Sequence, residues 1–395
     1  MKKLIVMGAA VEQLPGIKKA KELGYEVAVI DFNPNAVGIP YADKYYNVST
    51  IDAEGVYAAG KDFGAEGFLT LATDLPMRAV AYANEKMGII GISQETALKA
   101  TDKYEMIKAL KSHGVATPWY YILENKEDID IIKKELQYPC VLKPVDNAAS
   151  RGVVLVTKED ELVSAYDYSK ASSHCGTVIV EEYMQGHEVS VEVLTYDGNP
   201  NVLAVTDKLT TGAPHFVEKG HNQYSLLPEE DIARIKKLAI DAVVALGITI
   251  GPSHVEIMLT KSGPKVIELG ARLGGDCITS HLVQLSTGID MLKETIITLC
   301  GGKPDIVPKF QKGAAIRFLT ANKPGVLVRV EGIQKAEKAN GIVEVSMIMK
   351  QGDVITGDIG SSDDRIAYVI AQDEDPIKAI ADAETAINML TVVEE

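Results

Sequence analysis

One segment, HVEIMLTKSGPKVIELGARLGG at residues 254–275, constrains the fold more than any other part of this chain. Residues 254–260 and 265–269 are apolar and prone to β structure, and Lys261–Pro264 between them has the composition of a turn. We therefore expect two paired antiparallel strands here. The turn length fixes which residues face each other, because side chains alternate between the two faces of a strand.

Two acidic residues take matching places in this predicted hairpin. With Ser262 at the centre of the turn, Glu256 and Glu268 fall directly opposite each other. Like charges at roughly 5 Å destabilise a strand pair unless a cation lies between them. Oxygen ligands favour Mg²⁺ or Mn²⁺. Mg²⁺ is typically coordinated by one or two protein carboxylates together with the phosphates of its substrate. Arg272 follows closely and could bind a phosphate or carboxylate through two hydrogen bonds. The alternative is a solvated hairpin with surface acids.

Residues 1–95 alternate short apolar strands with helices, which predicts a Rossmann-like α/β domain with a doubly wound parallel sheet. The predicted strands are residues 2–8, 25–31, 44–48, 67–70 and 88–91. A dinucleotide fingerprint would place glycines at positions 8, 10 and 13, but the chain has Gly8, Ala10 and Gln13. Asp31 ends the second strand, where an acid often meets a ribose. We expect no NAD site.

The rest of the chain changes character twice. Residues 96–305 have an α+β pattern, with strands expected at 138–143, 153–156, 177–182, 188–196 and 202–209 and helices at 103–113, 159–169 and 229–246. Residues 306–395 are rich in strands, expected at 314–319, 325–332, 343–349 and 365–371. A closing helix at 376–390 has apolar residues at helical spacing, namely Ile377, Ile380, Ala381, Ile387 and Leu390.

The net charge of −15 over 395 residues argues against a nucleic acid or an anionic membrane as partner. The four cysteines are widely spaced, so a disulfide framework or a zinc site is not expected. The sequence shows no signal peptide and no apolar run of 18 residues. We expect a soluble, cytoplasmic protein.

Several polar residues occupy apolar settings that suggest nucleotide binding. Lys143 follows the run Cys140-Val141-Leu142, so its buried ammonium needs an anionic partner. The connector at 146–153 is small and polar, and its backbone N–H groups could close over phosphates. Strand 177–182 ends in Glu181 and Glu182, and Tyr183-Met184 could contact a flat base. Each signal alone is equally compatible with an ordinary surface turn or a solvated helix.

As an ordered set these motifs resemble the ATP-grasp superfamily over essentially the full length, with the carboxylate–amine ligases and biotin carboxylase nearest. The motifs are Lys103, Val141-Leu142-Lys143-Pro144, Ser150–Gly152, Glu181-Glu182-Tyr183-Met184, Glu188, Glu256, Glu268 and Arg272. The resemblance implies a preATP-grasp Rossmann-like domain (1–95), an ATP-grasp domain (96–305) and a β-rich C-terminal domain (306–395).

The resemblance also implies roles for these residues. ATP phosphates would be bound by Lys103, Lys143 and the loop containing Ser150 and Gly152. Adenine would be recognised by Glu181 and by the backbone from Glu182 to Met184, and the ribose by Glu188. Glu256 and Glu268 would hold Mg²⁺, or Mn²⁺ in its place, and Arg272 would steady the transferred phosphoryl group. One departure is Gly270, where the family often has an Asn that ligates the metal.

The expected activity is an ATP-dependent carboxylate–amine ligase that forms an amide or peptide-type bond through an acyl phosphate, acting on small-molecule substrates. Glu218 and His221 resemble a Glu-x-x-His element near the substrates of L-amino-acid ligases, and a surface loop is the alternative. Asp74 and the Gly274-Gly275-Asp276 segment are further candidates for contact with substrate. The alternatives are a purine-biosynthetic ATP-grasp enzyme and a non-catalytic ATP-binding regulatory protein. A homodimer is expected from the family alone.

Overall fold

In the computed structural model, which describes residues 2–147, 152–213 and 216–395, the chain begins with a four-stranded parallel sheet of order β3-β2-β1-β4. Its strands are β1 (Lys3–Met7), β2 (Glu26–Ile30), β3 (Lys44–Tyr46) and β4 (Gly67–Leu69). The strands β1, β2 and β4 are short, apolar and largely buried, as expected for a sheet that is covered on both faces, whereas the edge strand β3 is partly exposed. The Rossmann-like α/β character predicted for this region is confirmed.

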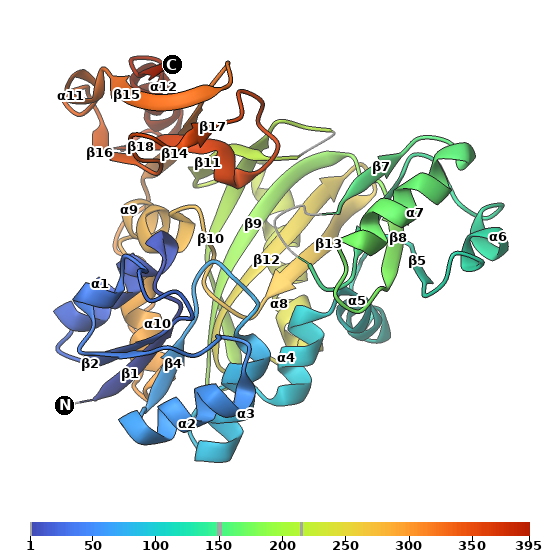
Figure 1. The fold of residues 1–395 in the computed structure, drawn as a ribbon, viewed down its shortest axis with the longest axis horizontal. Helices are drawn as coiled ribbons and strands as arrows, with labels where there is room; N and C mark the ends of the chain where they lie inside the picture. The colour runs from blue at the N-terminus through green and yellow to red at the C-terminus, as the bar shows by residue number, and fades with distance from the viewer. Residues whose placement is uncertain (1, 148–151, 214–215) are drawn as a thin grey trace.

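Helices from distant parts of the chain cover the two faces of this sheet. On one face, Leu4 and Val6 pack with α1 (Leu14–Glu22) and with α10 (Met291–Leu299), which follows the hairpin in sequence. On the other face, Ile5 and Met7 pack with α2 (Ala53–Phe63) and α3 (Met77–Met87). Because α10 contacts α1 and β4, the first sheet is joined to the region that follows the hairpin (Figure 1).

The predicted strand at residues 88–91 is wrong. Gly88, with a φ of +66°, ends α3 in the left-handed conformation, and the amide of Ile89 bonds back to the carbonyl of Asn84. The segment then runs irregularly to α4 (Gln94–Thr101) and α5 (Lys103–Ser112). Two isoleucines beside glycines suggested a buried strand, but they form a helix C-cap and a connector.

A small antiparallel sheet of order β5-β8-β6-β7 follows. Its strands are β5 (Tyr120–Leu123), β6 (Cys140–Pro144), β7 (Val154–Val156) and β8 (Val178–Glu182). Buried residues of α7 (Leu162–Ala171) and α6 (Asp128–Ile132) pack on one side of it. The other side faces the large sheet described next (Figure 1).

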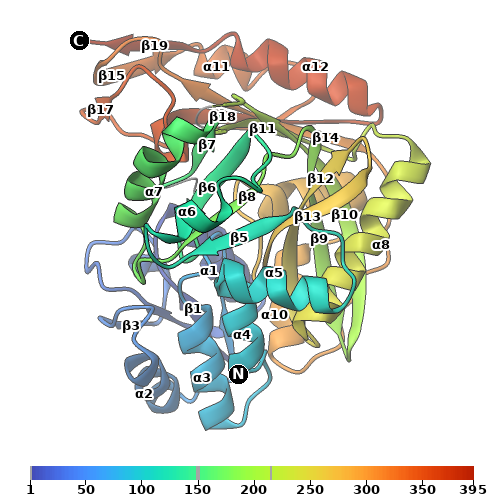
Figure 2. The same ribbon diagram turned by 90° about the vertical axis from the view of Figure 1, so that its right-hand side faces the viewer.

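The large sheet is antiparallel, has eight strands and runs in the order β13-β12-β9-β10-β11-β14-β18-β16. Its strands are β9 (Gly186–Tyr196), β10 (Asn199–Thr210), β11 (Glu218–Gln223), β12 (Gly251–Thr260), β13 (Gly263–Gly270), β14 (Gly313–Thr320), β16 (Ile342–Met347) and β18 (Arg365–Asp373). Helix α8 (Glu229–Leu246) packs against β9, β10, β12 and β13 (Figure 2). The sheet continues through β11 and β14, so strands before and after residue 305 share one hydrogen-bonded surface.

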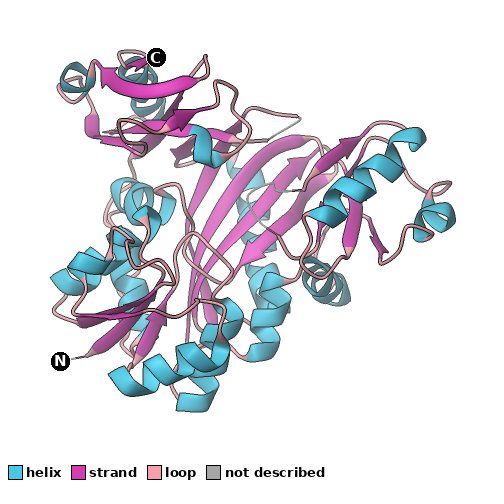
Figure 3. Cartoon of the chain, in the orientation of Figure 1, coloured by secondary structure: helices cyan, strands magenta, loops and turns pink. Residues whose placement is uncertain are grey.

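The C-terminal region adds a three-stranded sheet of order β17-β15-β19 beside α12 (Figure 3). Its elements are β15 (Gly325–Glu331), α11 (Ile333–Ala336), β17 (Val354–Ile355), α12 (Pro376–Ile387) and β19 (Thr391–Glu394). Earlier in the chain, a π-helical turn (Ile278–Leu282) and α9 (Val283–Thr287) lead into α10. The three strands of this sheet, together with β14, β16 and β18, make up the β-rich C-terminal region that the sequence predicts.

The predicted apolar stripe on the closing helix is only partly correct: Ile380, Ile387 and Leu390 pack in the core, but the helix ends at Ile387 and the other two positions are exposed. The buried residues of α12 are Ala379, Ala383 and Ala386, whereas Ile377 is 65% exposed and Ala381 is also exposed. Ala383 packs on alanines of β14 and β18. The helix therefore approaches the sheet closely enough that small side chains take the contact positions.

Among the helices of the described chain, none combines the length and the apolar character needed to cross a bilayer.

Candidate functional site

A cleft of about 610 Å³ lies between the small sheet and the large sheet. The small sheet contributes residues of β6 and β8, and the large sheet contributes residues of β9, β10, β12 and β13. Seven carboxylates line it, from Asp74, Glu181, Glu182, Glu188, Glu218, Glu256 and Glu268. Its lining also includes Lys103, Lys143, Lys208, Arg272, His187 and His254. Within the described part of the lining, the carboxylates outnumber the four Lys and Arg side chains, so an anionic ligand would need positive charge in addition to these four.

Glu256 and Glu268 are direct partners across β12 and β13, as predicted. The predicted turn centred on Ser262 is wrong, because Thr260 pairs with Gly263, and a register shift between Glu256 and Ile257 brings the two glutamates opposite each other.

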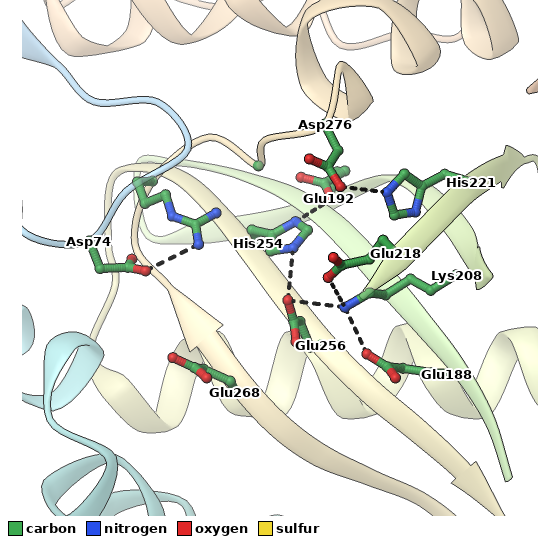
Figure 4. A network of polar contacts seen from close by, with 12 residues as sticks. Asp74, Glu188, Glu192, Lys208, Glu218, His221, His254, Glu256, Glu268 and Asp276 are labelled. Atoms are coloured by element: carbon green, nitrogen blue, oxygen red, sulfur yellow. Dashed lines mark hydrogen bonds and ion pairs between the residues drawn. The ribbon is translucent and has the colours of Figure 1, made fainter. Parts of the chain in front are cut away.

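Both glutamates line the cleft. Protein cations reduce their repulsion: Lys103 Nζ lies 2.8 Å from Glu268 Oε1, and Lys208 Nζ lies 3.3 Å from Glu256 Oε1. His254 Nε2 is 3.5 Å from the same oxygen of Glu256 (Figure 4). The positive charge needed between the two facing glutamates is thus supplied in part by side chains of the protein itself.

Lys208 on β10 is a functional candidate that the sequence analysis missed. Its side chain is only 5% exposed, and its ammonium lies 2.7 Å from Glu188 and 3.6 Å from Glu218, besides Glu256. Burial alone would lower the pKa of Lys208, but the surrounding carboxylates raise it well above its ordinary value. Lys208 therefore stays protonated. Its ammonium links Glu188, Glu218 and Glu256, the acids that we expect near the ribose, the substrate and the metal.

Glu192 and His254 form a buried pair behind Glu256 (Figure 4). They face each other across β9 and β12, with 2.6 Å between His254 Nδ1 and Glu192 Oε1. Burial would lower the pKa of His254, but the carboxylate of Glu192 raises it to about 9. Burial would also raise the pKa of Glu256, but Lys208 and His254 hold it well below its ordinary range. Glu256 is therefore ionised and its position is defined from two sides.

The buried Lys143 has the anionic partner that the sequence predicts. Its ammonium lies 2.6 Å from Glu181 on the adjacent strand, and both side chains are 9% exposed. Although burial opposes the charged form, Glu181, Glu268 and Glu256 raise the pKa of Lys143. Both residues line the cleft, beside Glu268 and Lys103.

The predicted adenine-side residues line the cleft at the end of β8. Glu182 pairs with Lys265 at 2.6 Å, which ties the small sheet to β13. Tyr183 and Met184 follow in the connector to β9. These positions offer an aromatic ring, a thioether and backbone polar groups to a flat ligand.

The predicted phosphate loop is only partly described. Ser150 lies outside the described residues. Gly152 has a φ of +78°, and its carbonyl accepts a hydrogen bond from Ser169 Oγ at 2.7 Å. The next residue, Val153, lines the cleft.

Glu218 and His221, both on β11, have different environments. Glu218 lines the cleft and pairs with Arg365 of β18 at 3.0 Å. His221 is 1% exposed and reaches Asp276 at 2.9 Å through Nε2. Arg365 also holds Asp276, at 2.7 Å, so one C-terminal arginine joins both parts of the predicted substrate element. Burial would raise the pKa of Asp276, but His221 and Arg365 hold it far below its ordinary value.

Arg272, just beyond β13, meets an acid from the first domain. Its Nη2 lies 3.1 Å from Asp74 Oδ2, and both side chains line the cleft. The backbone supports this contact, because Leu71 and Leu273 form a parallel bridge.

In the first βα turn, nearby side chains accept hydrogen bonds from the backbone amides. The carboxylate of Asp31 accepts hydrogen bonds from the amides of Ala9 and Asn33, each at 2.8 Å. Gln13 Oε1 accepts from the amide of Ala10, and its amide nitrogen donates to the carbonyl of Leu71. Asp31 therefore stabilises its own loop.

Comparison with known proteins identifies two parts of the chain. A family model described as ATP-grasp domain matches residues 136–280, which span β8, β9, β10, β12 and β13 around the cleft. A second, described as L-amino acid ligase C-terminal domain 2, matches residues 317–395 and includes Arg365. This chain contains an ATP-grasp domain.

Several curated relatives of this chain are named as ligases. The chain is 28% identical over 324 residues to alanine–anticapsin ligase of Bacillus subtilis, a match of 76% of this chain and 68% of that protein. The chain spans between 65% and 68% of the length of the first curated relatives it matches.

Two solved structures share the fold over 100% of this chain, at 23% identity each. The L-amino acid ligase from Bacillus licheniformis superposes with a TM-score of 0.88 over 99% of its chain. The phosphoribosylglycinamide synthetase from Anaerococcus prevotii superposes with a TM-score of 0.82 over 100% of its chain.

Proposed function

We propose that this protein is an ATP- and Mg²⁺-dependent ligase that joins the carboxyl group of an amino acid to an amine through an acyl phosphate. One observation carries the proposal: Glu256 and Glu268 face the same cleft as Lys103, Lys143 and Arg272. This set combines oxygen ligands for a divalent cation with cations for phosphate groups. Its relatives named as amino acid ligases support the substrate class.

The residues present fit Mg²⁺. The donors are carboxylate oxygens, the type this hard cation prefers. Within the described ranges no group of three or more His, Cys, Asp or Glu residues could enclose a metal by itself. This is the donor set expected where phosphate oxygens complete the coordination. Mg²⁺ bound by Glu256 and Glu268 would offset the acidic excess of the cleft and polarise the γ-phosphate of ATP.

The nucleotide would lie along the small sheet. Lys103 and Lys143 would bind its phosphates, and the loop that includes Ser150 and Gly152 would cover them. Adenine would contact Tyr183 and Met184, beside Glu181 and Glu182. Glu188, held by Lys208 at 2.7 Å, would accept hydrogen bonds from the ribose hydroxyls.

The chemistry that this arrangement can perform has two steps. A carboxylate oxygen attacks the γ-phosphorus, the bond to the β-phosphate oxygen breaks, and ADP leaves. The amine then attacks the carbonyl carbon, the C–N bond forms, and inorganic phosphate leaves while the amine loses a proton. Arg272 stabilises the charge on the transferred phosphoryl group and on the tetrahedral intermediate.

The amine would bind on the Glu218 side of the cleft. Glu218 projects from β11 into the lining and could hold an ammonium or amine. His221 lies behind it and contacts Asp276, so we propose that His221 acts by positioning Asp276. Arg365 fixes both acids from the C-terminal region.

A second candidate is a purine-pathway ligase, supported by the phosphoribosylglycinamide synthetase that shares the fold. Such an enzyme needs a cationic site for a ribose phosphate in addition to the ATP site. Among the residues that the structure describes, the Lys and Arg of the cleft lining are Lys103, Lys143, Lys208 and Arg272, and the first three each contact a glutamate. This arrangement favours the amino acid ligase.

The test is phosphate and ADP release from MgATP, screened against single amino acids, pairs of amino acids, and phosphoribosylamine together with glycine. Stimulation by amino acids or their pairs, with ADP formed, is the expected result. Turnover that occurs only when phosphoribosylamine accompanies glycine would establish the purine activity. Tight ATP binding without turnover for any substrate would establish a regulatory protein.

A further inference from the structure

A cluster of four interacting side chains lies outside the cleft, where the chain passes from Asp276 into the π-helical turn. Its members, Cys277, His281, Glu344 and Tyr368, are not part of the cleft lining. The imidazole of His281 hydrogen bonds to the thiol of Cys277, and its Nε2 lies 3.4 Å from Glu344 Oε2. The phenol of Tyr368 donates to the other oxygen of Glu344, at 2.7 Å. A thiol, an imidazole and a carboxylate are therefore in consecutive contact.

His281 carries a positive charge beside the thiol. Burial would lower the pKa of His281, but hydrogen bonds to Cys277 and Glu344 raise it to about 10. His281 in turn holds the pKa of Glu344 below its ordinary value, so the carboxylate is ionised and stabilises the imidazolium. A cysteine beside a histidine cation is favoured in its thiolate form, which is the form that attacks disulfides.

The other three cysteines have environments that oppose a thiolate. Cys140 and Cys300 are buried, and burial raises the pKa of each thiol to about 11. Cys175 is exposed, but its thiol hydrogen bonds to the carboxylate of Asp146, which is a negative charge. Cys277 is only partly exposed and yet has a cation as its neighbour. Exposure and charge therefore rank Cys175 and Cys277 in opposite orders, which makes the two thiols a direct comparison.

Cys277 is coupled to the substrate side of the cleft through the backbone. Asp276 and Cys277 have φ values of +53° and +60°, a left-handed conformation that costs a non-glycine residue about 1–3 kcal/mol and persists only where its surroundings hold it. Asp276 is held by His221, as Figure 4 shows, and by Arg365. Cys277 packs against an apolar cluster that includes Ile316. Atoms added to its sulfur would displace Cys277 from this packing and move Asp276 with it.

From this geometry we propose that Cys277 is a modification site for small disulfides, and that a mixed disulfide at its sulfur reversibly inactivates the protein. The thiolate sulfur of Cys277 attacks one sulfur of the disulfide, a new S–S bond forms, the original S–S bond breaks, and the second sulfur leaves as a thiolate. The disulfide is reduced and Cys277 is oxidised. An excess of a thiol reverses the step by the same exchange. The inactivation rests on the proposed function, whereas the modification itself does not.

The labelling test uses the intact chain and hydroxyethyl disulfide, a small uncharged disulfide, and follows each cysteine by peptide mass spectrometry. At pH 7 we expect Cys277 to gain the mixed disulfide at least about tenfold faster than Cys175, because thiolate content outweighs exposure. Between pH 8 and pH 6 the rate at Cys277 should fall less than the rate at Cys175, a difference that access to the sulfur alone does not produce. Labelling of Cys277 no faster than that of Cys175 would overturn the proposal.

His281→Gln keeps a hydrogen-bonding side chain and removes the charge. It should slow labelling of Cys277 at least about tenfold and leave labelling of Cys175 unchanged. His113→Gln, at an exposed histidine that ends α5, is the matched control and should be labelled as wild type is. Circular dichroism checks that both variants are folded, and the pH comparison in wild type tests the same point without a variant. An unchanged rate at Cys277 in a folded His281→Gln protein would contradict the role of the imidazolium.

The inactivation is tested by turnover before and after labelling. For wild type we expect phosphate release with amino acids to fall at least about tenfold as Cys277 is modified, and to return when dithiothreitol removes the mixed disulfide. Cys277→Ser should turn over as wild type does and keep its activity in hydroxyethyl disulfide. Complete modification of Cys277 with undiminished turnover would refute the inactivation. Absence of turnover with any substrate, with Cys277 still the fastest-labelled thiol, would contradict the proposed function and support the modification site.

Discussion

Lys208 Nζ lies 3.3 Å from Glu256 Oε1, although β10 and β12 are separated by β9 in the large sheet. A lysine two strands away therefore neutralises part of the charge that the Glu256–Glu268 pairing creates. The same ammonium contacts Glu188 and Glu218.

We predict that Lys208→Met lowers the free energy of unfolding by about 3 kcal/mol, because it leaves three carboxylates close together without their shared cation. Urea denaturation followed by circular dichroism measures the change. Lys237→Met is the control, since Lys237 is 75% exposed on α8 and should change stability by less than about 0.5 kcal/mol. A Lys208→Met protein as stable as wild type would mean that the acids are neutralised in another way.

Glu268→Gln should abolish turnover while the fold remains intact. The glutamine keeps the shape but weakens cation binding, so we expect phosphate release to fall at least about 100-fold and the Mg²⁺ concentration for half-maximal activity to rise. Glu384→Gln, at the Arg317 contact of α12, is the control for loss of an acid elsewhere. Undiminished phosphate release with a lowered melting temperature would assign Glu268 a structural role.

Arg365→Lys should raise the KM for the amine substrate more than it lowers kcat. A lysine cannot reproduce the two-sided contact with Glu218 and Asp276, so the orientation of both acids is lost. We expect a KM increase of roughly tenfold or more and an unchanged KM for ATP. Equal effects on both substrates would indicate a general disturbance of the interface.

His281 should give stability a pH dependence. Its Nε2 lies 3.4 Å from the carboxylate of Glu344 in β16. Burial would lower the pKa of His281, but hydrogen bonds to Cys277 and Glu344 raise the pKa to about 10, above the ordinary 6.5. Because the folded pKa is the higher one, the stabilisation is complete below about pH 6.5 and disappears as the pH rises through about 10. The difference in unfolding free energy between wild type and His281→Gln should therefore shrink from pH 6 to pH 10. A constant difference would contradict the raised pKa.

The sequence predicts elements whose signals are local. Helix α8 begins after Pro228 and ends before Gly247, which has a φ of +80°, so both ends were predictable. The pairing of Glu256 with Glu268 was predicted from the hairpin pattern, but it depends on a register shift between Glu256 and Ile257 that the turn does not reveal. The buried face of α12 likewise depends on how closely the helix approaches alanines of β14 and β18, which no pattern within the helix reveals.

The partners of the site residues were harder to predict than the residues themselves. Lys143 and Glu181 could be selected from their apolar strands, but their 2.6 Å contact depends on the pairing of β6 with β8. Lys208 is surrounded by acids from three other strands, β9, β11 and β12, so only the assembled sheet identifies it. Arg365 enters the site from more than 140 positions after Glu218 in the chain.

The hydrogen bonding of β11 to β14 has a consequence for synthesis of the chain. β11 is made early, yet its second edge is covered only when residues 313–320 emerge and pair with it. Until then the nascent protein has an open β edge, a template for pairing with another chain. A protein shortened to residue 305 should therefore aggregate even though its cleft-lining residues are all present. The C-terminal region thus covers the edge of the large sheet and prevents it from pairing with other chains while the protein is made.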